Sequence, residues 1–83
     1  MAMRQGNVMV GESAQIVLGI DPGLNRTGYA VLERTPLGPF LREGGVISST
    51  PKLTLAERVL EIGTGLREVI EQYRPDAMAI EQI

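Results

Sequence analysis

The chain of 83 residues carries ten acidic and eight basic residues, a formal net charge of −2, and 43% hydrophobic residues. This composition is ordinary for one small globular domain, and its acidic balance gives no overall electrostatic case for nucleic-acid binding. The chain has no cysteine and no histidine, which excludes disulfides, thiolate or imidazole zinc sites and Ser-His or Cys-His nucleophile pairs. Carboxylates, hydroxyls, amides, Lys and Arg remain for chemistry.

Residues 1–15 are mostly polar and lack the compact apolar region of a secretory signal. We expect them to form a flexible extension, with the folded part over residues 16–83. No apolar run approaches the roughly 20 residues that a membrane-spanning helix needs. These features, with the missing cysteines, favour a cytoplasmic protein without a membrane partner.

Three strands are predicted first, over residues 16–21, 29–35 and 40–48. The first is almost wholly apolar, as in a strand covered on both faces. Turn-forming residues fill 21–28 and 36–39. Gly44-Gly45 interrupts the third strand and indicates an edge position or a bulge. The short connections favour an antiparallel meander.

A helix is predicted next, because apolar residues recur at three-four spacing from Leu55 to Tyr73. Thr54 and Glu57 form a capping box at its start, and Pro75 ends it at about Tyr73. Gly63 and Gly65 inside the helix indicate close packing on the sheet. Residues 76–83 are predicted to form a fourth strand, which a right-handed crossover places parallel to the first. The fold class is therefore α/β.

Both predicted central strands lead into an acid, Asp21 after the first and Glu81 after the last. Taken alone, Asp21 is typical of a turn opener and Glu81 of a solvated acid, and spacing leaves these alternatives open. Alternation puts Asp21 on the face of Gly19 and Glu81 on the face of Ala79, where small residues indicate open space. If the strands are adjacent and parallel, about 4.8 Å apart, the two carboxylates meet at one edge of the sheet.

Two carboxylates this close repel each other unless a cation lies between them. Mg²⁺ is the natural candidate because it prefers hard oxygen ligands, and Mn²⁺ is its expected substitute. An inventory of carboxylates also suits metal-assisted phosphodiester hydrolysis. We therefore predict Asp21 and Glu81 as metal ligands and catalytic residues.

Asn25, Arg26 and Thr27 follow Asp21 in the first predicted loop. Arg26 and the loop N–H groups are candidates for contact with a phosphate, which makes these three residues a predicted nucleic-acid contact. A single Arg in a polar turn is more often simply solvated, and the other basic residues form no stripe.

The motif Asp-Pro-Gly-x-x-x-Thr-Gly at residues 21–28 is joined to Pro-Asp…Ile-Glu-Gln at residues 75–82, and the combination is specific. It resembles RuvC-type Holliday-junction resolvases, the crossover-junction endodeoxyribonucleases. Residues 45–47 and 55–62 agree in order and spacing, so that the resemblance covers residues 16–83.

The resemblance implies an RNase H-like fold and a homodimeric, Mg²⁺-dependent nuclease that nicks four-way DNA junctions symmetrically in recombination and repair. It implies a branch-migration helicase complex as a partner. Asp21 matches the first catalytic carboxylate of the family and Glu81 the second. The implied mechanism is in-line attack of a metal-activated water on the scissile phosphate.

Family members continue through a junction-contacting segment, a dimer helix, a basic surface and a helix with two further catalytic aspartates. We therefore expect the chain to be the amino-terminal half of such a resolvase, with an incomplete fold and little or no activity alone.

Two alternatives stay open. Another RNase H-like nuclease, acting on structured RNA, also begins with an apolar strand, Asp and a Gly-rich turn. Actin-like and sugar-kinase folds use a similar Gly-x-Asp-x-Gly turn to hold nucleotide phosphates without nuclease activity. The stretch at residues 27–29 and the Glu81-Gln82 pair favour the resolvase.

Overall fold

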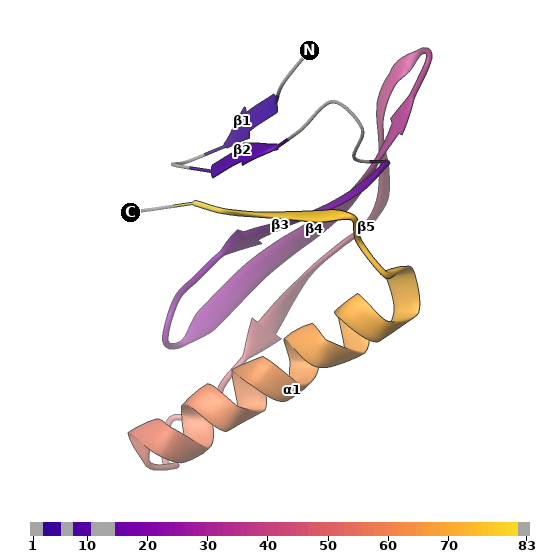
Figure 1. Cartoon of the computed structure of the whole chain (residues 1–83). Helices are drawn as coiled ribbons and strands as arrows, with labels where there is room; N and C mark the ends of the chain where they lie inside the picture. The colour runs from indigo at the N-terminus through magenta and orange to yellow at the C-terminus, as the bar shows by residue number, and fades with distance from the viewer. Residues whose placement is uncertain (1–2, 6–7, 11–14, 82–83) are drawn as a thin grey trace.

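The computed structural model describes residues 3–5, 8–10 and 15–81. Its seven elements form a two-stranded sheet, a four-stranded sheet and one helix (Figure 1). They are β1 (Met3–Gln5), β2 (Val8–Val10), β3 (Ile16–Asp21), β4 (Arg26–Thr35), β5 (Gly38–Ser48), α1 (Leu55–Tyr73) and β6 (Ala77–Ile80).

The four-stranded sheet has the order β5-β4-β3-β6. β3, β4 and β5 form an antiparallel meander, and β6 returns after α1 to pair with β3 in parallel. The predicted strand, strand, strand, helix, strand topology is confirmed. The apolar run of residues 16–21 occupies a central strand, as its lack of alternation predicts.

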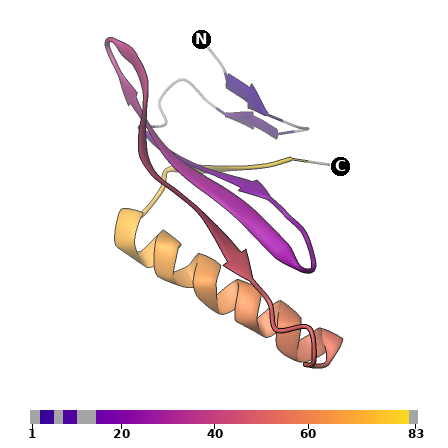
Figure 2. The same cartoon turned by 180° about the vertical axis from the view of Figure 1, so that it is seen from behind.

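One face of the sheet packs against α1, and the core lies between them. Leu18, Ile20 and Val31 from β3 and β4 meet Val69 of α1, and all four side chains are buried. Only the carboxyl-terminal half of the predicted apolar stripe takes part, because Val59 stays 57% exposed. Figure 2 shows α1 below the sheet, with its early turns extending past the strands.

Three strands differ in their bounds from the prediction. β6 spans only Ala77–Ile80 of the predicted residues 76–83, of which 82–83 lie outside the described residues. β4 begins at Arg26 and not at residue 29, because it pairs with β5 as far as Arg26↔Ser48. β5 begins at Gly38, whose φ of 112° closes the turn at residues 36–37. β5 is an edge strand, as predicted, but its irregularity is not at the two glycines. The register shift opposite Val31 and Leu32 makes Arg42 the extra residue.

The ends of α1 are where the sequence places them. The Thr54 hydroxyl accepts a hydrogen bond from the Glu57 N–H, and the Glu57 carboxylate accepts one from the Thr54 N–H, which completes the capping box. Arg74 adopts the left-handed conformation with φ 47°, and its N–H donates to the Ile70 carbonyl. Pro75 follows directly, so the chain leaves the helix for β6.

The two helical glycines have different surroundings. A Cβ on Gly65 would lie 2.9 Å from Cγ2 of Ile47, whereas a Cβ on Gly63 would meet nothing within 4 Å. Close packing on the sheet therefore explains Gly65 and is wrong as an explanation of Gly63. We expect Gly63→Ala to raise the free energy of unfolding by about 0.5–1 kcal/mol, since Ala is the better helix former. Gly65→Ala should show no such gain; urea denaturation of both variants compares them, and the opposite order would contradict this packing.

Glu43 of β5 joins three elements on the helix side of the sheet. Its carboxylate accepts hydrogen bonds from the hydroxyls of Tyr29 in β4, at 2.6 Å, and Tyr73 of α1, at 2.7 Å. These bonds favour the charged carboxylate and lower the pKa of Glu43, with the Tyr29 bond as the larger cause. The same carboxylate raises the pKa of both tyrosines, because it binds their protonated hydroxyls.

This arrangement predicts a loss of stability in acid. A lowered pKa in the folded state means that the unfolded chain binds the proton first, so the Glu43 contribution is present above pH about 5 and is lost as the pH falls through the lowered pKa. We expect Glu43→Gln to remove that part of the pH dependence of the urea midpoint. The measurement runs between pH 3 and 6, a range that spans roughly the ordinary carboxyl pKa. If the urea midpoint of Glu43→Gln depended on pH as that of the unmodified protein does, the prediction would be wrong.

The amino-terminal segment contains two short strands. β1 and β2 pair as an antiparallel hairpin with the register Met3↔Val10, and this hairpin contacts β6. In both views it lies on the opposite side of the four-stranded sheet from α1 (Figures 1 and 2). The two strands form a sheet of their own, apart from the four-stranded sheet. The flexible extension over residues 1–15 and the folded part over residues 16–83 stay predictions. Within the described residues, no helix has the length and apolar character to cross a membrane.

Candidate active site

Asp21 and Glu81 follow directly on Ile20 and Ile80, the last residues that pair β3 with β6. β3 and β6 run parallel with Ile20 opposite Ile80, and the Glu81 N–H donates to the Ile20 carbonyl at 2.9 Å. Parallel strands are about 4.8 Å apart, so the backbones of the two acids are adjacent at the carboxyl edge of the sheet. Both residues are exposed. The structure therefore brings together the two acids that the sequence analysis paired.

The face that carries these acids is more filled than predicted. Gly19 lies opposite Ala79 in the β3–β6 register, and both are buried, as is Val17. The prediction of open space beside the acids is therefore wrong along the strands. Asp21 and Glu81 stand at the exposed end of a buried surface.

The loop after Asp21 makes a tight turn, which a buried side chain holds by hydrogen bonds. Thr27 is only 2% exposed, and its hydroxyl donates to the Gly23 carbonyl at 3.0 Å while accepting from the Gly23 N–H at 3.4 Å. A Cβ on Gly23 would lie 2.3 Å from the Arg26 carbonyl oxygen, so only glycine fits there. Thr27 thus holds the loop, and its buried position does not support the predicted contact with DNA.

The rest of the loop is bound to β5 and α1. The Ser49 hydroxyl donates to the Leu24 carbonyl at 2.6 Å, and the Ser49 N–H donates to the Asn25 carbonyl at 3.0 Å. Arg58 of α1 donates from Nε to the Ser49 hydroxyl and from Nη2 to Asn25 Oδ1. Of the predicted loop contacts, Asn25 is therefore partly engaged within the chain, and Arg26 is exposed.

Sequence reasoning missed Ser49 and Arg58. Arg58 appeared as one basic residue among eight Lys and Arg. Its position four residues after the Thr54 cap was the only available signal, since it places the side chain on the first turns of the helix. That signal does not show which loop the helix faces.

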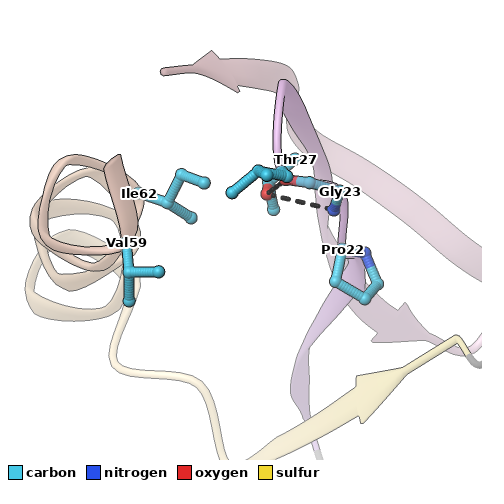
Figure 3. Close-up of a pocket in the computed structure, with 6 residues that line it drawn as sticks. Pro22, Gly23, Thr27, Val59 and Ile62 are labelled. Carbon is cyan, nitrogen blue, oxygen red and sulfur yellow. Dashed lines mark hydrogen bonds between the residues drawn. The ribbon is translucent and has the colours of Figure 1, made fainter. Parts of the chain in front are cut away.

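A pocket separates this loop from α1. It has a volume of about 360 Å³ and lies between Val59 and Ile62 on the helix and Pro22, Gly23, Leu24 and Thr27 on the loop side. Figure 3 shows Val59 and Ile62 pointing toward the loop across this space. The apolar side chains therefore leave the loop and the helix incompletely packed against each other.

The donor set of Asp21 and Glu81 fits a hard divalent cation. Both side chains offer carboxylate oxygens, which Mg²⁺ prefers, and no nitrogen or sulfur ligand accompanies them. Over residues 3–5, 8–10 and 15–81, no group of three or more acids, His or Cys is close enough to hold a metal ion. The two acids are thus a partial ligand set, and Mg²⁺ commonly completes such sets with waters and substrate phosphate.

The profile of the family described as crossover junction endodeoxyribonuclease RuvC matches residues 17–83. The chain belongs to the RuvC family. The RuvC of Rhodopirellula baltica is 54% identical over 71 residues, which are 86% of this chain and 40% of that protein. The RuvC of Geobacter sulfurreducens is 45% identical, over 81% of this chain and 41% of that protein. The chain therefore spans about 40% of the length of these RuvC relatives.

Solved RuvC structures show the same fold. Thermus thermophilus RuvC matches with a TM-score of 0.76 and 33% identity, over 83% of this chain and 43% of that one. The same enzyme in complex with a Holliday junction substrate matches with a TM-score of 0.74 and 35% identity, over 82% and 42%. The RNase H-like fold implied by the sequence is confirmed for this part of RuvC. The roles of Asp21 and Glu81 stay predictions.

Proposed function

We propose that these residues form the amino-terminal part of a Mg²⁺-dependent endonuclease that resolves four-way DNA junctions. The observation that carries the proposal is the parallel pairing of β3 and β6, which ends at Ile20↔Ile80 and is followed by Asp21 on one chain segment and Glu81 on the other. Membership of the RuvC family supports it, as does the similarity to a RuvC bound to a Holliday junction.

In this proposal Asp21 and Glu81 hold the cation through their carboxylate oxygens. The bound ion would supply Lewis-acid activation of water and stabilisation of the leaving oxygen. The β3–β6 pairing holds the backbones of the two acids side by side, and in this proposal both carboxylates reach one ion from there. Arg26 is exposed in the adjacent loop and is proposed to contact a phosphate of the DNA, with the Asn25 amide beside it.

The remaining expectations are proposals of the same kind. A homodimer, a branch-migration helicase partner and a cytoplasmic location follow from the family likeness. The further ligands of the cation would come from outside the described residues.

The experiment is cleavage by the complete gene product of three substrates in Mg²⁺: a four-way DNA junction, a linear duplex of the same sequence and a structured RNA. We expect paired nicks on opposite strands of the junction and little cleavage of the other two. Preferential cleavage of the RNA would favour the other RNase H-like nuclease. Thermal stabilisation by ATP without any cleavage would favour the nucleotide-binding alternative.

A further inference from the structure

We propose that Arg58 is a positioning residue for the active site, which holds the Pro22–Asn25 loop and, through it, Asp21. The inference rests on the proposed function, because it assigns Asp21 to the cation site. Arg58 lies on α1 and touches neither acid in the hydrogen bonds of the structure, so that its effect passes through the loop.

The guanidinium of Arg58 connects α1 to Ser49 and to the Pro22–Asn25 loop, which is distant in the chain. Its Nη2 donates to Asn25 Oδ1 at 2.5 Å and lies 3.5 Å from the Leu24 carbonyl oxygen. Its Nε donates at 3.0 Å to the hydroxyl of Ser49, which donates in turn to the same Leu24 carbonyl. Ser49 is buried, and all of its polar groups in this network have partners. The loop is thus bound to the end of β5 and to α1 at once.

Hydrogen bonds attach the Pro22–Asn25 loop to α1, because apolar side chains do not pack closely between them. The pocket of about 360 Å³ lies between the loop and α1, lined on its two sides by Leu24 and Val59 among others. Leu24 is 46% exposed and Val59 is 57% exposed, so neither fills the space. Among the hydrogen bonds of residues 15–81, those of Arg58 join the loop to the helix.

The loop is short enough for its position to affect Asp21. Asp21 ends β3, β4 begins at Arg26, and only residues 22–25 connect them. Asp21 also pairs with Gly28, whose added Cβ would lie 3.7 Å from the Asp21 Cβ. A shift at Leu24 or Asn25 therefore turns the backbone within a few bonds of the Asp21 carboxylate. Groups that orient a ligand in this way are commonly needed for metal affinity.

The geometry requires Arg and not only a positive charge. A guanidinium presents Nε and Nη donors in a rigid planar fork, which matches the Ser49 and Asn25 acceptors on two sides. A Lys ammonium is a single point at the end of a flexible chain. The variant Arg58→Lys therefore keeps the charge and removes the fork, which separates positioning from general attraction of DNA.

The test measures two properties of the complete gene product with Arg58→Lys, and with Arg67→Lys as the matched control at an exposed position of the same helix. The first is amide hydrogen exchange of residues 24–26 without metal. The second is the Mn²⁺ concentration for half-maximal junction cleavage. We expect faster exchange in the loop and about a tenfold higher Mn²⁺ requirement in Arg58→Lys, with the rate recovered at high Mn²⁺. Arg67→Lys should change neither.

Ser49→Ala gives a second variant that tests the network from the other side. Its effect on the Mn²⁺ requirement should not add to that of Arg58→Lys, because both break the same connection. Unchanged loop exchange in Arg58→Lys, or a loss of thermal stability with an unchanged Mn²⁺ requirement, would overturn the inference. Cleavage by the unmodified protein that needs no divalent cation would instead overturn the proposed function, and the exchange result would still decide whether Arg58 holds the loop.

Discussion

Replacing Asp21 with Asn is expected to lower the rate of junction cleavage by about 10³-fold while leaving junction binding almost unchanged. A metal ligand contributes several kcal/mol to stabilisation of the transition state, and each 1.36 kcal/mol corresponds to about a factor of ten in rate. Asn has nearly the shape of Asp but lacks its charge, so the β3–β6 pairing that ends at Ile20↔Ile80 should persist. Single-turnover cleavage with the complete gene product measures the rate, and a gel-shift assay measures binding.

Asp76→Asn is the matched control, because Asp76 lies at the opposite end of the same strand pair. Its Oδ2 accepts from the N–H groups of Gln15 and Ile16 at 3.0 and 2.9 Å, which ties the start of β3 to the start of β6. This change should lower stability without a comparable loss of cleavage. Glu81→Gln should behave like Asp21→Asn. Equal cleavage by Asp21→Asn and Asp76→Asn would remove Asp21 from the site.

The sequence predicts those parts of the fold whose signals are local. β3 and α1 have the predicted bounds, since an apolar run closed by Asp-Pro-Gly and a helix with a capping box each define their own ends. The predicted start of β4 was wrong because the residues Arg26-Thr27-Gly28 have the composition of a turn. Its strand conformation depends on pairing with β5, which lies at a distance in the sequence. β1 and β2 were not predicted for a different reason, because two strands of three residues each carry little pattern of their own.

In the candidate active site, too, one part could be predicted from the sequence and another could not. The adjacency of Asp21 and Glu81 follows from the topology alone, because parallel neighbours must end at the same edge. The role of Thr27 inside the loop and the bonds of Arg58 to Ser49 and Asn25 depend on the exact path of the loop. No periodicity encodes such contacts, and a polar residue in a turn looks the same whether it faces solvent or a buried carbonyl.

The loop geometry leads to a second large effect, at Gly23. We expect Gly23→Ala to lower the free energy of unfolding by about 2–4 kcal/mol, combining overpacking with the loss of a buried hydrogen bond. The new Cβ would lie 2.3 Å from the Arg26 carbonyl oxygen. The carbonyl oxygen belongs to the backbone and the Cβ is bonded directly to it, so no side-chain rotation relieves the contact. The loop must move, and the buried Thr27 hydroxyl then loses its Gly23 partners.

Gly44→Ala separates this contact from the general consequences of adding a methyl group to a glycine. Gly44 is exposed on the edge strand β5, and the nearest atom to its added Cβ would be the Tyr29 carbonyl oxygen at 3.8 Å, an ordinary contact distance. Its urea midpoint should stay near that of the unmodified protein, because the methyl group meets no obstacle and reduces the freedom of the unfolded chain. If Gly23→Ala denatured at the same urea concentration as Gly44→Ala, the loop after Asp21 would have room that this structure does not contain, and the tight turn would lose its role in fixing the carboxylate.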